Sequence, residues 1–193
     1  MSGSGPVRPS GSGPGRPARP RVGLRRCRPD DATEIAALVA LDASVPAGIL
    51  GDTGPDWHRA AAADPDRLHV VAAGTGREVD GYLVLAAPRG PEPGVELHRL
   101  VVAPARRGSG LGRALLDTAL TLTGADPGAP CLDTGTTEVP AWLHAGRLWL
   151  EVAPDNTAAL ELYRAAGLVV ETQLPSVPGD PSSPVRRLVL SRG

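Results

Sequence analysis

A glycine-rich stretch flanked by arginines is the part of the chain best suited to chemistry. Residues 101–113 read V-V-A-P-A-R-R-G-S-G-L-G-R, and the pattern predicts a strand, a loop and then a helix. Glycines at 108, 110 and 112 let the backbone approach a ligand closely and adopt φ angles that other residues avoid. The helix start offers unpaired N–H groups and the positive end of a dipole, where phosphate binds. The stretch therefore predicts a diphosphate-binding loop, with charge-assisted hydrogen bonds available from Arg106, Arg107 and Arg113.

Two other glycine-rich phosphate motifs do not fit this loop. The P-loop needs Lys and then Ser or Thr after its last glycine, but Arg113 and Ala114 follow Gly112. The G-x-G-x-x-G fingerprint, started at Gly108, needs a glycine where Arg113 stands. It also needs a βαβ unit with an acidic residue about 20 positions on, which is not evident here. The remaining pattern is (R/Q)-x-x-G-x-(G/A) after V-x-P, filled by Val102, Pro104, Arg107, Gly110 and Gly112.

That spacing resembles the acetyl-CoA-binding motif of the GNAT N-acetyltransferase superfamily. A second stretch, residues 149–168, reads W-L-E-V-A-P-D-N-T-A-A-L-E-L-Y-R-A-A-G-L. It is similar to the family's second signature, in which a strand ending in L-E-V precedes an Asn and a helix carrying A-x-x-L-Y. The two motifs stand in the family's order, about 40 residues apart, and the resemblance covers roughly residues 21–193.

The resemblance implies how acetyl-CoA is held. Backbone N–H groups of the glycine loop would bind the pyrophosphate, and the end of the preceding strand would pair with pantetheine as an added strand does. A backbone N–H of that strand would also polarise the thioester carbonyl. No metal is implied. The implied binding residues are Leu100, Val101, Val102, Arg107, Gly108, Ser109, Gly110, Leu111, Gly112, Arg113 and Asn156, of which Asn156 also suits a helix N-cap.

The resemblance also implies the catalytic groups. Tyr163 occupies the tyrosine position of the second signature, and a phenol with an ordinary pKa of about 10 can protonate a leaving thiolate at pH 7. Glu96 matches a position where relatives often carry Glu, so we expect it to be the general base, acting through water. His98 stays open as an alternative base, because an ordinary imidazole pKa of ~6.5 suits that work. Each residue also has a structural reading, as a core aromatic or as a polar residue of a half-exposed strand.

The elements that would position these residues follow from hydrophobic patterning and turn residues. They predict the order β-α-α-β-β-β-α-β-α-β-β, an α/β fold with a mixed sheet of about seven strands and flanking helices. A kink or bulge is expected at Asp80-Gly81. The expected strands are 22–28, 68–73, 81–86, 95–102, 148–152, 168–174 and 186–191, with helices opening at 29–31, around 57–58, at 111 and at 157.

Two expectations concern the strand at 95–102. Regular alternation places Val95, Leu97 and Arg99 on one face and Glu96, His98 and Leu100 on the other. The GNAT resemblance, rather than periodicity, implies that this strand and the one at 148–152 splay apart to admit the pantetheine arm.

Composition bounds the domain organisation and localisation. We expect residues 1–20, rich in Gly, Pro, Ser and Arg, to be a disordered tail and residues 21–193 to form one GNAT domain. Residues 1–28 hold seven arginines and no acid, but no aromatics interleave with them, so nucleic-acid binding is not expected. The spacing of Cys27 and Cys131 fits neither a disulfide framework nor a zinc site. Without a long apolar run or a secretory segment, we expect a cytoplasmic protein with no membrane partner.

These observations predict an N-acetyltransferase that moves an acetyl group from acetyl-CoA to a primary amine by direct attack in a ternary complex. The acceptor would be a small molecule or a peptide, and a homodimer is a further expectation because relatives often dimerise. The alternative is a non-catalytic module of the same fold that binds acyl-CoA as a sensor or scaffold.

Overall fold

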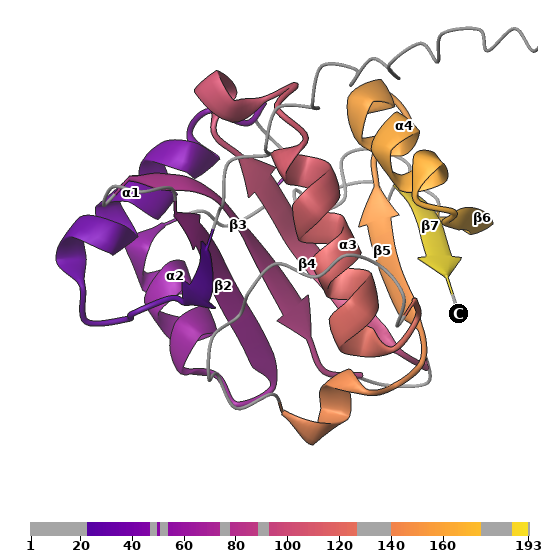
Figure 1. Cartoon of the computed structure of the whole chain (residues 1–193), viewed down its shortest axis with the longest axis horizontal. Coiled ribbons are helices and arrows are strands. Elements are labelled where there is room, and N and C mark those ends of the chain that lie inside the picture. Colours follow the sequence, from indigo (N-terminus) through magenta and orange to yellow (C-terminus); the bar gives the residue numbers. More distant parts are fainter. Residues whose placement is uncertain are drawn as a thin grey trace, which may run out of the picture.

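The helices and strands follow the order predicted from the sequence (Figure 1). The computed structural model describes residues 23–46, 50, 54–73, 78–88, 93–126, 140–174 and 187–192. The predicted tail at 1–20, the turn at 74–77 and Cys131 lie outside the described residues. The elements are β1 (Gly23–Arg26), α1 (Ala32–Asp42), α2 (Pro55–Ala63), β2 (Arg67–Ala73), β3 (Val79–Ala86), β4 (Val95–Val102), α3 (Leu111–Thr123), β5 (Leu148–Val152), α4 (Thr157–Ala165), β6 (Val169–Leu174) and β7 (Arg187–Arg192), with short 3-10 turns at Pro104–Arg106 and Ala141–Leu143.

The strands form one seven-stranded sheet in the order β1-β2-β3-β4-β5-β7-β6. All neighbours are antiparallel except β4 and β5, which run parallel. The parallel pairing covers only two positions, Val95 with Leu148 and Glu96 with Trp149. Beyond these positions β4 continues to pair with β3, and β5 continues to pair with β7. The two central strands therefore splay apart, as the family resemblance implies.

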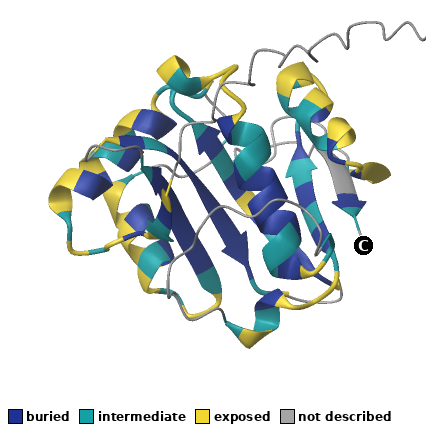
Figure 2. Cartoon of the chain, in the orientation of Figure 1, coloured by how far each residue is buried: buried dark blue, intermediate teal, exposed yellow. Residues whose placement is uncertain are grey.

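Helices cover both faces of the sheet. On one face, α3 and α4 pack onto the larger core cluster, which includes Leu83 and Leu85 of β3. On the other face, α1 packs Ile35 and Leu38 against β3 residues of the opposite orientation, such as Val84. Because both faces are covered, β3 is buried along almost its whole length, as its dark-blue ribbon shows (Figure 2).

A bulge in β4 changes which residues share a face. Val84 pairs with Arg99 and Leu85 pairs with Leu97, so His98 has no partner on β3. After the bulge, Leu100 joins the α3-facing cluster, and Arg99 lies on the side of α1 and α2, where its guanidinium contacts Asp42 of α1. The alternation predicted for Arg99 and Leu100 was wrong, because one extra residue in a strand turns every later side chain to the opposite face.

The irregularity predicted at Asp80-Gly81 is confirmed. Ala72 pairs with Gly81 but Ala73 pairs with Val79, which leaves Asp80 as the extra residue of β3. Gly81 then lies opposite Val102, at the end of β4 that leads into the glycine loop.

Helix α1 begins at a side-chain cap, and two of its charged residues, Glu34 and Asp42, are buried. The Asp31 carboxylate accepts hydrogen bonds from the N–H groups of Thr33 and Glu34, each at 3.1 Å. Ile35, Leu38 and Asp42 follow at helical spacing, and all three are buried. A buried carboxylate at the end of an apolar helix face requires partners, which the neighbouring elements supply.

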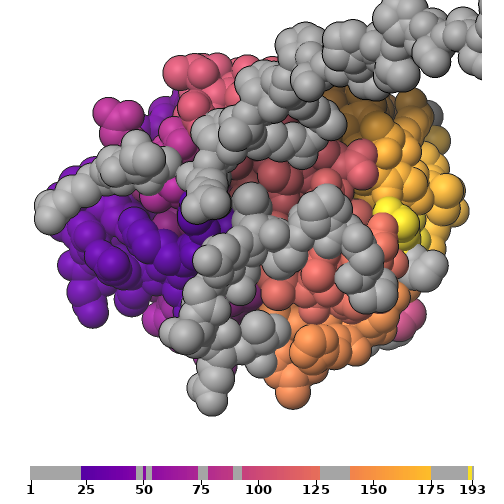
Figure 3. Space-filling view, viewed as in Figure 1, coloured from indigo at the N-terminus to yellow at the C-terminus, as the bar shows by residue number. Residues whose placement is uncertain are grey.

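The N-terminal helices and α4 lie at opposite sides of the molecule (Figure 3).

Among the residues that the structure describes, no helix combines the length and the apolar character needed to span a membrane.

The close approach of β3 and β4 gives the first prediction. A Cβ atom at Gly81 would lie 2.7 Å from the backbone oxygen of Val101, which cannot move without disturbing the sheet. We expect Gly81→Ala to lower the free energy of unfolding by about 1–3 kcal/mol, measured by urea denaturation. Gly23→Ala in β1 is the matched control, since a Cβ there would meet no described atom within 4 Å. Equal stability of the two variants would contradict this reading of the contact.

Candidate active site

The glycine loop leaves the start of α3 open. Gly108 (φ 74°) and Gly110 (φ 87°) adopt left-handed conformations, which residues with side chains rarely adopt. A Cβ on either would meet no atom of the described structure within 4 Å, so the loop faces outward. Gly110 is the N-cap of α3, and no side chain caps this helix. The N–H groups of its first turn, together with the helix dipole, suit the pyrophosphate of coenzyme A.

Other residues of the glycine loop stabilise its conformation. The Ser109 hydroxyl donates to the backbone oxygen of Arg106 at 2.6 Å, and Leu111 is buried in the larger core cluster. Gly112 lies near both β4 and α4, since a Cβ there would lie 3.6 Å from side-chain atoms of Val102 and Leu162, which is an ordinary contact distance. The end of β4, the start of α3 and helix α4 thus meet at this glycine.

The two predicted arginine helpers differ in their surroundings. Arg107 is exposed and makes only long contacts, such as 3.3 Å from Nη2 to the backbone oxygen of Ser44. Arg113 donates from Nε to Asp117 at 2.7 Å and from Nη1 to the backbone oxygen of Ala165 at 2.8 Å. Arg113 therefore ties α3 to the end of α4, whereas Arg107 is free to turn toward an anion. A contact of either residue with the cofactor stays a prediction.

The splay exposes one backbone edge of β4. Between residues 97 and 102, β4 pairs with β3 on one side, and no described strand pairs with its other side. Leu100 and Val102 are half-buried against the larger core cluster, and Val101 is buried on the opposite face. An extended ligand can hydrogen-bond to such an edge as an added strand does.

Glu96 and His98 lie together where the strands begin to splay. Oε1 of Glu96 lies 2.9 Å from Nδ1 of His98, and both side chains are partly exposed. The His98 ring stacks on Trp57 of α2, with the ring centroids 5.9 Å apart and the planes 14° from parallel. The pair therefore lies on the sheet face that α1 and α2 cover, beside the opening between β4 and β5.

Tyr163 lies on the other face of the sheet. Its ring packs, half-buried, against the core cluster that α3 and α4 cover. Burial raises the pKa of Tyr163 to about 12, so the phenol keeps its proton at neutral pH. No hydrogen bond joins its hydroxyl to another described residue. Asn156 caps α4 by accepting from the N–H of Ala159 at 3.3 Å, which confirms its structural reading; its contact with the cofactor stays a prediction.

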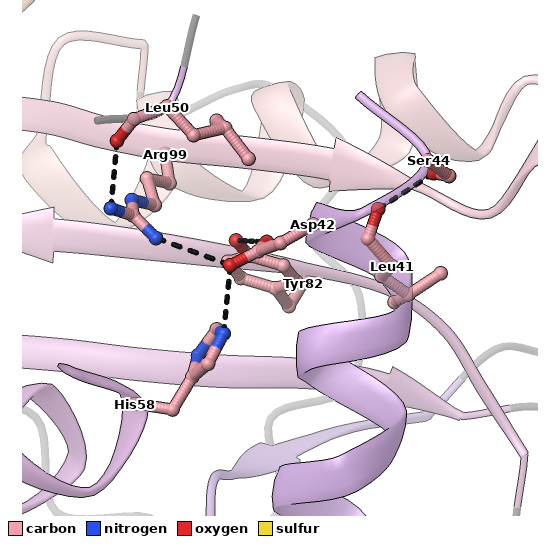
Figure 4. A network of polar contacts seen from close by, with 7 residues as sticks. All are labelled: Leu41, Asp42, Ser44, Leu50, His58, Tyr82 and Arg99. Carbon is pink, nitrogen blue, oxygen red and sulfur yellow. Dashed lines mark hydrogen bonds and ion pairs between the residues drawn. The ribbon is translucent and has the colours of Figure 1, made fainter. Parts of the chain in front are cut away.

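A buried polar cluster lies beneath the Glu96–His98 pair, with the Asp42 carboxylate at its centre (Figure 4). Nε2 of His58 and Nη1 of Arg99 lie 2.9 Å and 3.3 Å from the same carboxylate oxygen. The Tyr82 hydroxyl donates to the other oxygen, and burial together with this bond raises the pKa of Tyr82. The second amino group of Arg99 donates to the backbone oxygen of Leu50 at 2.8 Å.

Aromatic rings surround this cluster. The guanidinium carbon of Arg99 lies 3.3 Å from the ring centroid of Trp57, a cation–π contact. The His58 ring stacks on His69, whose ring also lies against Tyr82. Burial, with His58 close by, lowers the pKa of His69 to about 3, so this ring is neutral in the folded protein.

A family model for an acetyltransferase (GNAT) domain matches residues 65–168, which is more than half of the chain and includes β4, the glycine loop and Tyr163. The chain belongs to the GNAT acetyltransferase family. It is an acyltransferase of the acetyl-CoA-dependent kind, as the two motifs predicted. No curated protein matches the sequence.

Solved structures share the fold of this acetyltransferase. A GNAT-family acetyltransferase from Streptococcus pneumoniae is 18% identical, with a TM-score of 0.59 over 89% of this chain and 98% of that chain. A variant of spermidine N-acetyltransferase from Vibrio cholerae is 16% identical, with a TM-score of 0.64 over 89% and 92%. A ribosomal-protein alanine N-acetyltransferase from Escherichia coli is 16% identical, with a TM-score of 0.60 over 89% and 92%. At these identities the likeness shows the fold alone.

The structure places the predicted glycine loop at the end of β4, Glu96 and His98 on the α1/α2 face of the sheet, and Tyr163 on the α3/α4 face. The catalytic and binding roles of these residues stay predictions. The buried cluster around Asp42 was not predicted. Its signal in the sequence was a charged residue within each of two otherwise apolar patterns, Asp42 in a helix and Arg99 in a strand. Within the described ranges, no three His, Cys, Asp or Glu side chains are grouped so as to hold a metal ion.

The lowered pKa of His69 predicts that the free energy of unfolding depends on pH. Between pH 6.5 and about 3 the unfolded chain binds a proton at His69 that the folded protein does not, so stability falls as pH decreases through this window. The loss is up to about 1.4 kcal/mol per pH unit. We expect His69→Leu to flatten this dependence, as measured by denaturant unfolding at several pH values. His144→Gln, at an exposed position, is the control and should retain the wild-type slope. The same slope in both variants would contradict the assignment to His69.

Proposed function

We propose that this acetyltransferase transfers an acetyl group from acetyl-CoA to a primary amine by direct attack in a ternary complex. The observation that carries this proposal is the splay of β4 and β5, with the open glycine loop where β4 ends, Glu96 and His98 on one face of the sheet and Tyr163 on the other. The continuous sheet from β1 to β7 supports a single domain from residue 21 to 193.

Two parts of the chain would hold acetyl-CoA, which supplies the acetyl group as a thioester. The N–H groups of residues 108–112 bind the pyrophosphate, helped by Arg107. The free edge of β4 at Leu100, Val101 and Val102 binds pantetheine, and a backbone N–H there polarises the thioester carbonyl. Holding both reactants in line contributes about 7–11 kcal/mol to lowering the barrier.

The two faces of the sheet then divide the proton transfers. On the α1/α2 face, Glu96 takes a proton from the amine through water while the amine nitrogen bonds to the acetyl carbon. As the carbon–sulfur bond breaks, Tyr163 on the α3/α4 face donates its phenol proton to the sulfur. His98 orients Glu96 through the 2.9 Å contact, or itself accepts the proton.

The acceptor would be a small-molecule or peptide amine. The structurally similar enzymes from Vibrio cholerae and Escherichia coli are named for spermidine and for a ribosomal-protein alanine, so the fold serves both kinds of acceptor. The partly exposed Glu96 carboxylate on the amine side favours an acceptor that arrives with a positive charge.

The test is a calorimetric titration with acetyl-CoA, followed by a thiol-release assay with spermidine and short peptides. Binding together with amine-dependent release of coenzyme A would support the proposal. Binding without release above the rate of hydrolysis would favour the alternative, a non-catalytic acyl-CoA-binding module. Absence of binding would contradict both.

Tyr163→Phe tests the general acid. Removing the hydroxyl leaves the ring packing intact but leaves no proton donor for the sulfur, so we expect kcat to fall about 10–1000-fold. The dissociation constant for acetyl-CoA, measured by calorimetry, serves as the control and should stay within a factor of about two. Wild-type turnover in this variant would remove Tyr163 from the mechanism.

Glu96→Gln and His98→Gln form a matched pair that identifies the base. Deprotonation of the true base produces the rise of kcat/KM on the acidic side of the pH profile, so its loss should abolish that rise and lower kcat/KM about 100-fold. We expect this result for Glu96→Gln, and a smaller loss with the rise retained for His98→Gln. The reverse outcome would assign the base to His98.

A further inference from the structure

The buried cluster around Asp42 requires an explanation beyond stability. Asp42, His58, Tyr82 and Arg99 come from four elements, and each is at most 4% exposed within an otherwise apolar core cluster. Replacing a buried ion pair with apolar residues of similar volume is often neutral or stabilising. A core built only for stability would gain little from the Arg99–Asp42 pair. The groups that Arg99 holds in place therefore indicate what the pair does.

Arg99 lies immediately after the β4 bulge and needs that bulge to reach its partners. With regular pairing after Leu97, its side chain would face the apolar cluster under α3, away from Asp42. An unpaired guanidinium in that cluster would be strongly unfavourable. The pairing of Arg99 with Asp42 therefore selects the bulged register.

The same guanidinium reaches two further groups on the amine side of the site. One amino group donates to the backbone oxygen of Leu50, in the connection between α1 and α2. Its flat face lies on Trp57, the ring on which His98 also stacks. A continuous series of direct contacts therefore connects Asp42 with Glu96 through Arg99, Trp57 and His98.

We propose that Arg99 is a positioning residue for catalysis: paired with Asp42, it fixes the β4 bulge and, through Trp57, aims the Glu96–His98 pair at the amine. The proposal rests on the proposed acetyl transfer, and it assigns Arg99 no contact with either substrate. Its contacts lie on the α1/α2 face, whereas the glycine loop lies at the far end of β4. Loss of Arg99 should therefore impair turnover and leave acetyl-CoA binding intact.

The test compares Arg99→Met and Arg99→Lys with Tyr82→Phe. Tyr82→Phe is the matched control, because it removes one hydrogen bond from the same carboxylate while Arg99, Leu50 and Trp57 remain in place. The measurements are kcat and the KM for the amine, the dissociation constant of acetyl-CoA, and hydrogen exchange at the amides of residues 95–102.

For Arg99→Met we expect kcat to fall about 100-fold, the effect of a displacement of roughly 1 Å. Acetyl-CoA affinity should stay within a factor of about two, and exchange in β4 should accelerate. Arg99→Lys should recover part of kcat but raise the amine KM, because an ammonium retains the charge and cannot both stack on Trp57 and reach Leu50. Tyr82→Phe should keep kcat within about threefold and β4 exchange at the wild-type rate.

Wild-type kcat with wild-type exchange in a folded Arg99→Met protein would overturn the proposal. If that variant does not fold, Arg99→Lys decides, and wild-type kcat and amine KM in it would likewise overturn the proposal. An inactive wild-type protein would refute the proposed acetyl transfer. Hydrogen exchange at the β4 amides would then be the remaining test of the positioning role. Equal exchange rates in the Arg99 and Tyr82 variants would refute that role.

Discussion

The site depends on parallel pairing that stops after two residues. β4 and β5 pair only at Val95–Leu148 and Glu96–Trp149, although each strand continues to pair with its other neighbour. Backbone groups inside a protein need partners, so the free edge of β4 is unfavourable unless water or an extended ligand satisfies it. In the proposed mechanism this incomplete sheet is the binding surface for pantetheine, and the glycine loop at the end of the same strand binds the pyrophosphate.

In the proposed mechanism, the splay explains why the general acid and the general base come from different layers of the fold. Tyr163 packs on the side of α3 and α4, whereas Glu96 and His98 lie on the side of α1 and α2. In a continuous sheet the backbone would separate these groups. In the proposed mechanism both faces border one opening at the splay, so an amine attacks from one side while the sulfur is protonated from the other. The two proton transfers need not compete for the same space.

The sequence revealed those parts of the fold whose signals are local. The glycine loop, the start of α3 and the Asn156 cap each depend on a few neighbouring residues. The order of the strands along the chain follows from short apolar runs. The bulge at His98 depends instead on how β4 aligns with β3 and on an ion pair with a residue 57 positions away. Periodicity along β4 contains neither fact, which is why the faces of Arg99 and Leu100 were wrongly assigned. The splay was available only from the family resemblance.

The two ends of β4 are held by different kinds of interaction. At the end that leads into the glycine loop, the backbone of β4 lies so close to Gly81 that there is no room for a side chain at this position. At the other end, an ion pair and an aromatic ring surround the bulge, and the strength of these contacts depends on exclusion of water. In the proposed mechanism, close packing at the first end fixes where the thioester lies, whatever the acceptor. Substitution of a few side chains of α1 and α2 would then change the electrostatic contacts at the other end, so acceptor preference could vary while the cofactor site stays the same.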